Sequence, residues 1–204
     1  GQEVKRPPAP TGPAPRLPNG HPDLSGVWIG GGATGDMERE GGMQKGEMDA
    51  LLQPWAKKLR DSREEAYEPY LQCLPAGIVR AGPYPWRMIQ TSTHEPEKYI
   101  FKVEEGSIHS WRQIFMDGRP HPKEPDPTWY GHSVGKWEGD TLVVDTIGMN
   151  DKSFVDNYRT PHTDKIHVVE RFKIIEGGKT LQATVTVDDP GAFNMPWSAV
   201  QRWK

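Results

Sequence analysis

The stretch from residue 129 to residue 151 constrains the fold most, because it joins two strand-like runs through a tight turn. Residues 129–137 and 140–147 are rich in aromatic and β-branched types, which favour β-strands. Glu138-Gly139 lies between them, and a two-residue loop that contains Gly is a β-hairpin signal. The sequence therefore predicts an antiparallel hairpin at the centre of the fold.

This hairpin predicts a histidine beside a carboxylate, because a turn at Glu138-Gly139 would place His132 directly opposite Asp145. A histidine held by a carboxylate can act as a general base, or the two groups can satisfy each other inside a core. A three-residue turn would instead place His132 opposite Thr146. The face predicted from the two-residue turn is mostly apolar and carries Tyr130, His132, Val134, Thr141, Val143, Asp145 and Ile147.

A second hairpin is predicted around Glu105-Gly106, between residues 98–104 and 107–116. With a two-residue turn, Tyr99 and Phe101 would share a face with Arg112.

A third hairpin is predicted around Gly177-Gly178, where Glu170 would face Val185. Glu170 is then a single carboxylate on an apolar inward face, so it must be paired or protonated. It could serve as a general acid, or it could form a buried ion pair with Arg112.

Further strands are predicted near residues 27, 88 and 200, which brings the total to eight to ten. This pattern favours an antiparallel, up-and-down, lipocalin-like β-barrel with long Pro/Gly-rich loops, and a β-sandwich is the alternative. One short α-helix is predicted from about residue 53 to 67, with Trp55 and Leu59 on its apolar face. Residues 1–22 are predicted to form a Pro-rich extended arm, and residues 23–204 a single barrel domain.

The composition of the chain limits the kinds of partner that it can bind. The net charge is −3 without a basic concentration, which argues against nucleic acid, and no run approaches the 18 apolar residues of a membrane span. The single cysteine, Cys73, rules out an intramolecular disulfide.

No cofactor is predicted. A divalent metal would need His109, His132, His162 and His167, which lack a compact ligand spacing. The oligomeric state stays open.

Six motifs are spread over residues 19–197: GHPDLSGVW, QCLPAG, MDGRPHPKEPDPTW, GHSVGKWEGDTLVVDTIGMND, HVVERF and DDPGAFNMPW. With these motifs the chain resembles a large family of secreted proteins that environmental bacteria encode in many copies. The resemblance implies a secreted or periplasmic protein with a single compact domain, and it implies no activity.

Three functions are compatible with these features, and the third is a metal-dependent enzyme whose ligands would have to come from different strands. The first is an exported, cofactor-independent enzyme of the lyase, isomerase or hydrolase type, acting on a small molecule in the barrel lumen. Its catalytic residues would be His132 as base, Asp145 as its orienting group and Glu170 as acid. The second is an exported, non-catalytic binding protein for an apolar or aromatic ligand. The predicted substrate-binding residues are Tyr130, Arg112, Trp111, Trp137, His109 and Asn150.

Overall fold

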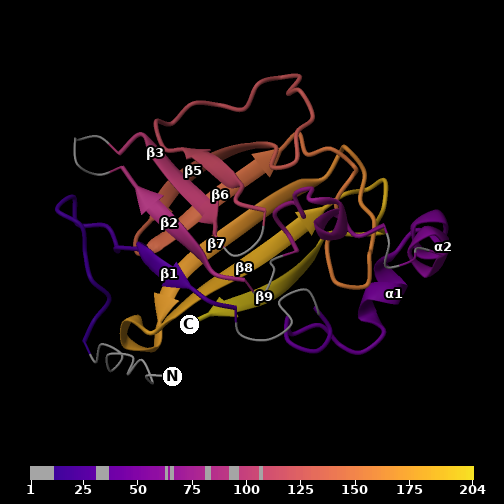
Figure 1. Cartoon of the computed structure of the whole chain (residues 1–204), viewed down its shortest axis with the longest axis horizontal. Helices are drawn as coiled ribbons and strands as arrows, with labels where there is room; N and C mark the ends of the chain where they lie inside the picture. The colour runs from indigo at the N-terminus through magenta and orange to yellow at the C-terminus, as the bar shows by residue number, and fades with distance from the viewer. Residues whose placement is uncertain are drawn as a thin grey trace.

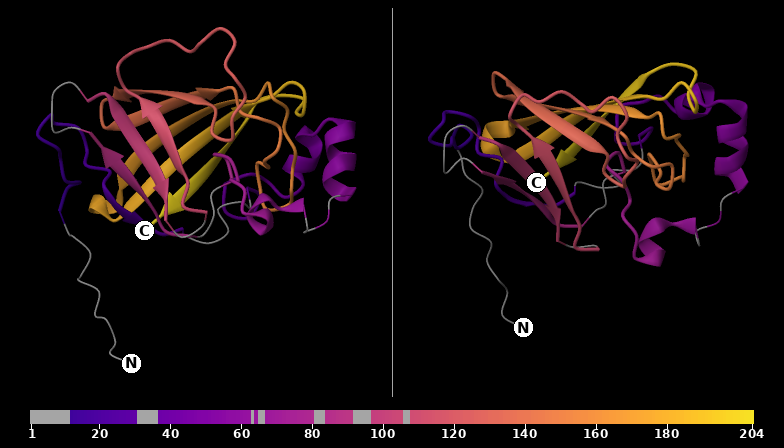
Figure 2. Two further views of the ribbon diagram at one scale, coloured as in Figure 1. Left: turned by 45° about the horizontal axis from the view of Figure 1, so that its top comes forward. Right: turned by 90° about the horizontal axis from the view of Figure 1, so that it is seen from above.

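The structure is a computed structural model that describes residues 12–30, 37–62, 64, 67–80, 84–91, 97–105 and 108–204. Within these ranges, nine strands follow one another across a single sheet in the order of the sequence (Figure 1). The sheet curls into a nearly closed barrel, as Figure 2 shows from two further sides. The strands are β1 (Gly26–Trp28), β2 (Trp86–Gln90), β3 (Tyr99–Glu104), β4 (Trp111–Phe115), β5 (His132–Glu138), β6 (Thr141–Ile147), β7 (His167–Ile175), β8 (Thr180–Asp188) and β9 (Trp197–Trp203).

The two edges of the sheet meet just beyond β1 and β9. Ile29 and Lys204 exchange two backbone hydrogen bonds of 2.9 Å, and an antiparallel bridge joins Gly30 to Trp203. The predicted β-barrel is therefore confirmed, and closure removes much of the exposed strand edge.

One pairing departs from the up-and-down pattern. β4 and β5 run parallel through two residue pairs, Ile114 with Ser133 and Phe115 with Val134. A parallel neighbour needs a connection that returns the chain to the starting end of the strand. Residues 116–131 make this connection, which we call the crossover loop.

The three hairpin predictions had different outcomes. The third is confirmed, because Glu170 pairs with Val185. The central register is wrong by two residues, since the turn is Gly139-Asp140 and Asp145 pairs with Val134. In the second hairpin, Val103 pairs with Trp111, so the connection is longer than predicted. Gly106 of its predicted turn lies outside the described residues.

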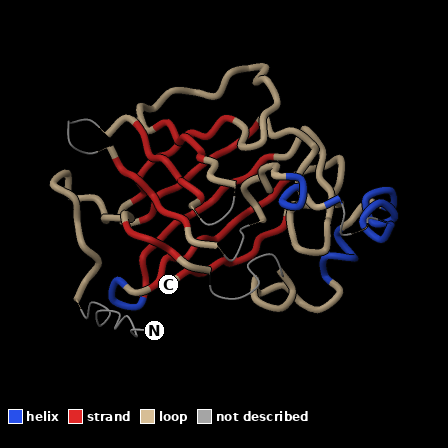
Figure 3. The backbone as a smooth tube through the Cα atoms, in the orientation of Figure 1, coloured by secondary structure: helices blue, strands red, loops and turns tan. Residues whose placement is uncertain are grey.

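The helical region is divided in two. α1 (Glu47–Leu51) precedes α2 (Pro54–Ser62), and Pro54 begins the second helix because proline suits the first helical turn. Trp55 and Leu59 are 45% and 36% exposed, so the predicted apolar face is buried less than expected. Both helices lie at the opposite end of the molecule from the 3₁₀ helix at Glu176–Gly178 (Figure 3). Two short 3₁₀ helices, η2 (Pro69–Gln72) and η3 (Glu176–Gly178), complete the described elements.

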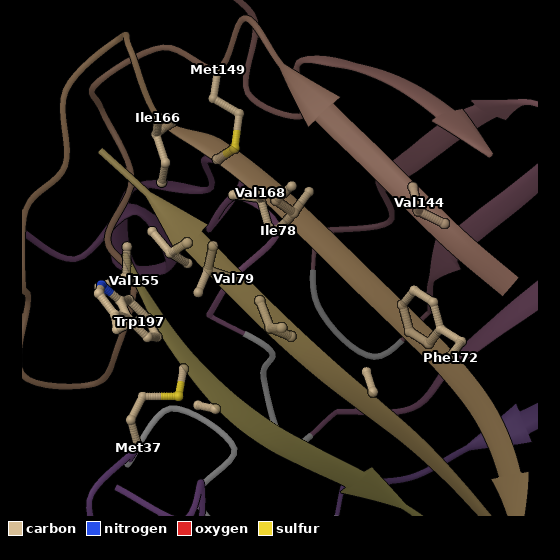
Figure 4. Close-up of a cluster of buried hydrophobic side chains, with 14 of the residues drawn as sticks. Met37, Ile78, Val79, Val144, Met149, Val155, Ile166, Val168, Phe172 and Trp197 are labelled. Carbon is tan, nitrogen blue, oxygen red and sulfur yellow. The ribbon is translucent and has the colours of Figure 1, made fainter. Parts of the chain in front are cut away.

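The barrel interior is packed by the inward residues of the strands, and part of it is drawn in Figure 4. Phe172 on β7 and Trp203 on β9 are fully buried there. The loop segment 76–79 also packs into this core: Val79 is 1% exposed, and its carbonyl oxygen accepts a hydrogen bond of 2.6 Å from Nε2 of Gln201. Protein atoms therefore occupy much of the space that a ligand would take in an open barrel.

No helix among the described residues is long and apolar enough to cross a membrane. Cys73 is exposed and has a positive φ of 57°.

Candidate functional site

Glu170 lies in the barrel interior as half of a buried ion pair. Its Oε2 atom is 2.6 Å from Nη1 of Arg112, and the two side chains are 4% and 3% exposed. The two atoms meet as an ion contact without hydrogen-bond geometry. Nε of Arg112 donates to Oγ of Ser133 at 2.9 Å, and Nη2 donates to Oγ1 of Thr146 at 2.7 Å. Two hydrogen bonds and one ion contact thus hold the guanidinium. The sequence allowed Glu170 to be a general acid or half of a buried ion pair, and the structure shows the ion pair.

His132 and Glu170 lie on opposite faces of the sheet, so they do not form the single luminal site that the sequence predicted. Alternate residues of a strand point to opposite faces. Ser133 on β5 and Thr146 on β6 are 1% and 0% exposed and face inward. His132 and Asp145 therefore face outward, where both are partly exposed.

The outer face gathers three histidines around Asp145. Nδ1 of His132 is 2.9 Å from Nδ1 of His121. Nε2 of His121 is 3.2 Å from Oδ1 of Asp145, and Nε2 of His167 is 2.7 Å from the same oxygen. We call this continuous chain of contacts, His132–His121–Asp145–His167, the histidine relay. It is assembled from β5, the crossover loop, β6 and β7.

The position of each member follows from the fold. His132 and Asp145 share the outer face and lie diagonally across the β5–β6 hairpin, because the two-residue register error preserved the face. His167 is the first residue of β7 and points outward like Asp145. The crossover loop folds back along this face and inserts His121 between His132 and Asp145.

The hydrogen bonds define the tautomers when Asp145 is ionised. A carboxylate accepts hydrogen bonds, so His121 and His167 must each carry a proton on Nε2. Neutral His121 then has an unprotonated Nδ1, which accepts a hydrogen bond from Nδ1 of His132. His132 is left with a bare Nε2, and this atom has no hydrogen-bond partner within the described part of the chain. The relay thus presents two unprotonated ring nitrogens on partly exposed side chains, Nε2 of His132 and Nδ1 of His167. His132 differs from His167 in that its other ring nitrogen contacts a second histidine, to which it can pass a proton.

The surroundings of His132 keep it neutral. Burial lowers its pKa below the ordinary value of 6.5, and the nearby charge of Arg119 lowers it further, as does a charge on His121 whenever that ring is protonated. The ring also stacks on Phe115, with centroids 5.1 Å apart. His132 is therefore in its base form at pH 7.

Gly131 allows the chain to enter β5 at the relay. Its φ is +61°, and a Cβ atom there would press against the carbonyl oxygen of Ile147. We expect Gly131→Ala to lower the free energy of unfolding by about 1–3 kcal/mol in urea titrations, because strain against backbone relaxes poorly. Gly139→Ala is the matched control, since Gly139 has a φ of +60° and nothing within 4 Å. Equal losses of unfolding free energy in the two variants would contradict the close approach of residue 131 to the carbonyl oxygen of Ile147.

Two of the predicted substrate-binding residues, Tyr130 and Asn150, have structural partners. The hydroxyl group of Tyr130 is hydrogen-bonded to Oγ of Ser110, and burial is the main cause that raises the pKa of Tyr130 to about 12. Asn150 accepts a hydrogen bond of 3.1 Å from the backbone N–H of Lys152 and so forms a turn.

The remaining predicted site residues do not converge. Trp111 points outward and is 58% exposed, whereas the indole of Trp137 donates to Glu97 at 2.9 Å. His109 is exposed in a loop, and His162 is buried with Oγ of Ser153 at 2.9 Å. The four candidate metal ligands are thus spread over three places. Among the described residues no group of three or more His, Cys, Asp or Glu side chains is arranged to hold a metal.

His121 was not among the predicted site residues. The signal for it was its place in the long Pro-rich loop 117–128, a kind of segment that often carries binding groups.

No family model, curated protein or solved structure matches this chain. The resemblance drawn from the motifs therefore stays a prediction, and the case for function rests on the residues themselves.

Proposed function

We propose that this protein is an enzyme that acts on a small molecule by general base catalysis, with Nε2 of His132 as the base. The single observation that carries the proposal is the hydrogen-bonded chain that leaves this nitrogen unprotonated. Export of the protein, which the motif resemblance implies, remains part of the proposal.

The relay gives the abstracted proton a favourable destination. When Nε2 of His132 takes a proton from the substrate or from a water molecule, its Nδ1 proton can pass to Nδ1 of His121, 2.9 Å away. The positive charge then resides on His121, whose Nε2–H faces the carboxylate of Asp145. His167 holds Asp145 from the other side at 2.7 Å. Charge separation at the reacting atom is thereby reduced, which lowers the barrier to proton transfer.

Proton abstraction is the first step of elimination, isomerisation and base-assisted hydrolysis alike. The test is therefore a panel with one readout for each: release of 4-nitrophenol from aryl esters, β-elimination from aryloxy ketones, and exchange of the α-proton of ketones with deuterium oxide. We expect turnover of at least one class by the wild type and about a 10²–10⁴-fold lower rate for His132→Gln.

His109→Gln is the matched control, because His109 is an exposed histidine outside the relay. It should keep the wild-type rate. Turnover that survives in His132→Gln, or a panel without any turnover, counts against the proposal.

A binding protein without turnover is the second candidate, favoured by exposed apolar side chains on the outer face of β1–β4, such as Trp111 and Ile89. Under this alternative, ligands would bind and His132→Gln would change affinity, while no member of the panel would be converted.

A further inference from the structure

The outer face of β3 and β4 carries four aromatic side chains that touch in sequence. The ring centroids of Trp111 and Phe101 are 5.7 Å apart, those of Phe101 and Tyr99 are 6.0 Å apart, and those of Tyr99 and Phe115 are 5.9 Å apart. We call these four residues the aromatic ladder. They share a face because Val103 pairs with Trp111 and Tyr99 pairs with Phe115, the register that the sequence did not predict.

The ladder is accessible to solvent. Trp111 is 58% exposed, and the other three rings are partly exposed. Ile89 on β2 is 45% exposed and extends the same face, because it pairs with Phe101. Val27 on β1 is 48% exposed and lies beyond Arg87 on this face. A contiguous apolar face of this kind marks a binding surface more often than isolated exposed residues do.

The ladder ends at the histidine relay. Phe115 is its last ring, and it stacks on His132 with centroids 5.1 Å apart. A flat molecule that lies along the ladder would therefore place one end beside the base.

A cation lies at the same junction. The guanidinium carbon of Arg119 is 4.0 Å from the centre of the Phe115 ring. Asp117 holds the guanidinium through Nε and Nη2, with contacts of 2.6–3.1 Å. Nη1 makes no hydrogen bond within the described part of the chain, and the side chain is 41% exposed. Arg119 thus offers a fixed donor to an anionic group.

We propose that the aromatic ladder binds an aromatic carboxylate, with the ring on Trp111 and Phe101 and the carboxylate toward Nη1 of Arg119. This inference rests on the proposed function, because it names the substrate class of the relay. The ring of such a ligand would stack on the exposed rings of the ladder, and its carboxylate would pair with the guanidinium of Arg119.

The test is calorimetric titration with 2-naphthoate and with its neutral analogue 2-naphthalenemethanol. We expect the wild type to bind 2-naphthoate, and Trp111→Ala to weaken binding about fivefold to tenfold, the size of a lost ring contact. Arg119→Met should weaken the binding of 2-naphthoate by a similar factor and leave the binding of 2-naphthalenemethanol unchanged. Trp55→Ala removes an exposed indole from α2 and is the matched control, expected to bind like the wild type.

Several results would overturn the inference. These are no binding of 2-naphthoate, equal losses in Trp111→Ala and Trp55→Ala, or an Arg119→Met variant that loses both ligands equally. Sedimentation of the wild type as a dimer that Trp111→Ala converts to a monomer would show an interface between copies instead.

The two proposals fail separately. If turnover depends on His132 but 2-naphthoate does not bind, the proposed ligand site on the ladder is wrong and the proposed base stands. If 2-naphthoate binds to the ladder but no substrate is converted, the proposed base is wrong and the ligand site stands.

Discussion

Arg112→Met is expected to lower the free energy of unfolding by about 3–5 kcal/mol, because it leaves the buried Glu170 carboxylate without its counter-charge. The Arg112 and Glu170 side chains are 3% and 4% exposed, so water cannot replace the lost partner. Ser133 and Thr146 would also lose the donors that now reach them at 2.9 and 2.7 Å. Urea unfolding followed by far-ultraviolet circular dichroism measures the change.

Two further variants make this expectation specific. Arg171→Met breaks an ion pair with Glu138 on the outer face, where both side chains are 40% exposed or more, and should unfold close to the wild type because solvent screens the charges. Arg112→Met combined with Glu170→Leu should recover much of the loss, because neither charge remains buried. An Arg112→Met variant as stable as Arg171→Met would contradict the buried pair.

Asp145→Asn is expected to lower kcat/KM by about 10²–10⁴-fold while leaving the fold intact, because it removes the charge that stabilises protonated His121. If the amide oxygen faces His121 and His167, their tautomers stay and the counter-charge alone is lost. If the amide nitrogen faces them, the tautomers reverse and His132 acquires a proton on Nε2. Rates on the substrate identified by the panel measure either outcome.

Asp188→Asn is the matched control for this prediction. Asp188 is an exposed carboxylate on the same outer face, and its backbone pairs with that of His167. The control should keep the wild-type rate within about twofold, as a surface change distant from the reacting atom does. Similar losses in the two variants would mean that the negative charge of the whole face is needed, and not the relay contact.

The sequence predicts the barrel well where local turn chemistry and hydrophobic pattern agree. Gly177-Gly178 lies between two long alternating runs, and the register of this hairpin is as predicted. In the central hairpin, both Glu138-Gly139 and Gly139-Asp140 are two-residue turns with Gly, and the local pattern does not choose between them. The chain uses the second, with Gly139 at a φ of +60°.

The site is harder to predict, because β5 inverts the usual pattern of faces. Its inward positions include Ser133 and Gly135, whereas Val134 points outward. Ser133 is needed as a partner for Arg112, and a Cβ atom on Gly135 would lie 2.5 Å from Sδ of Met116. Both reasons involve residues of other segments, so the alternation within residues 132–138 alone assigns His132 to the wrong side of the barrel.

The most direct test of the proposed base is the nitrogen-15 NMR spectrum of the histidine rings at pH 8, assigned with single His→Gln variants. The relay predicts that His132 carries its proton on Nδ1, and that His121 and His167 carry theirs on Nε2. Observation of a proton on Nε2 of His132 would contradict the account, because that atom could no longer accept one from a substrate.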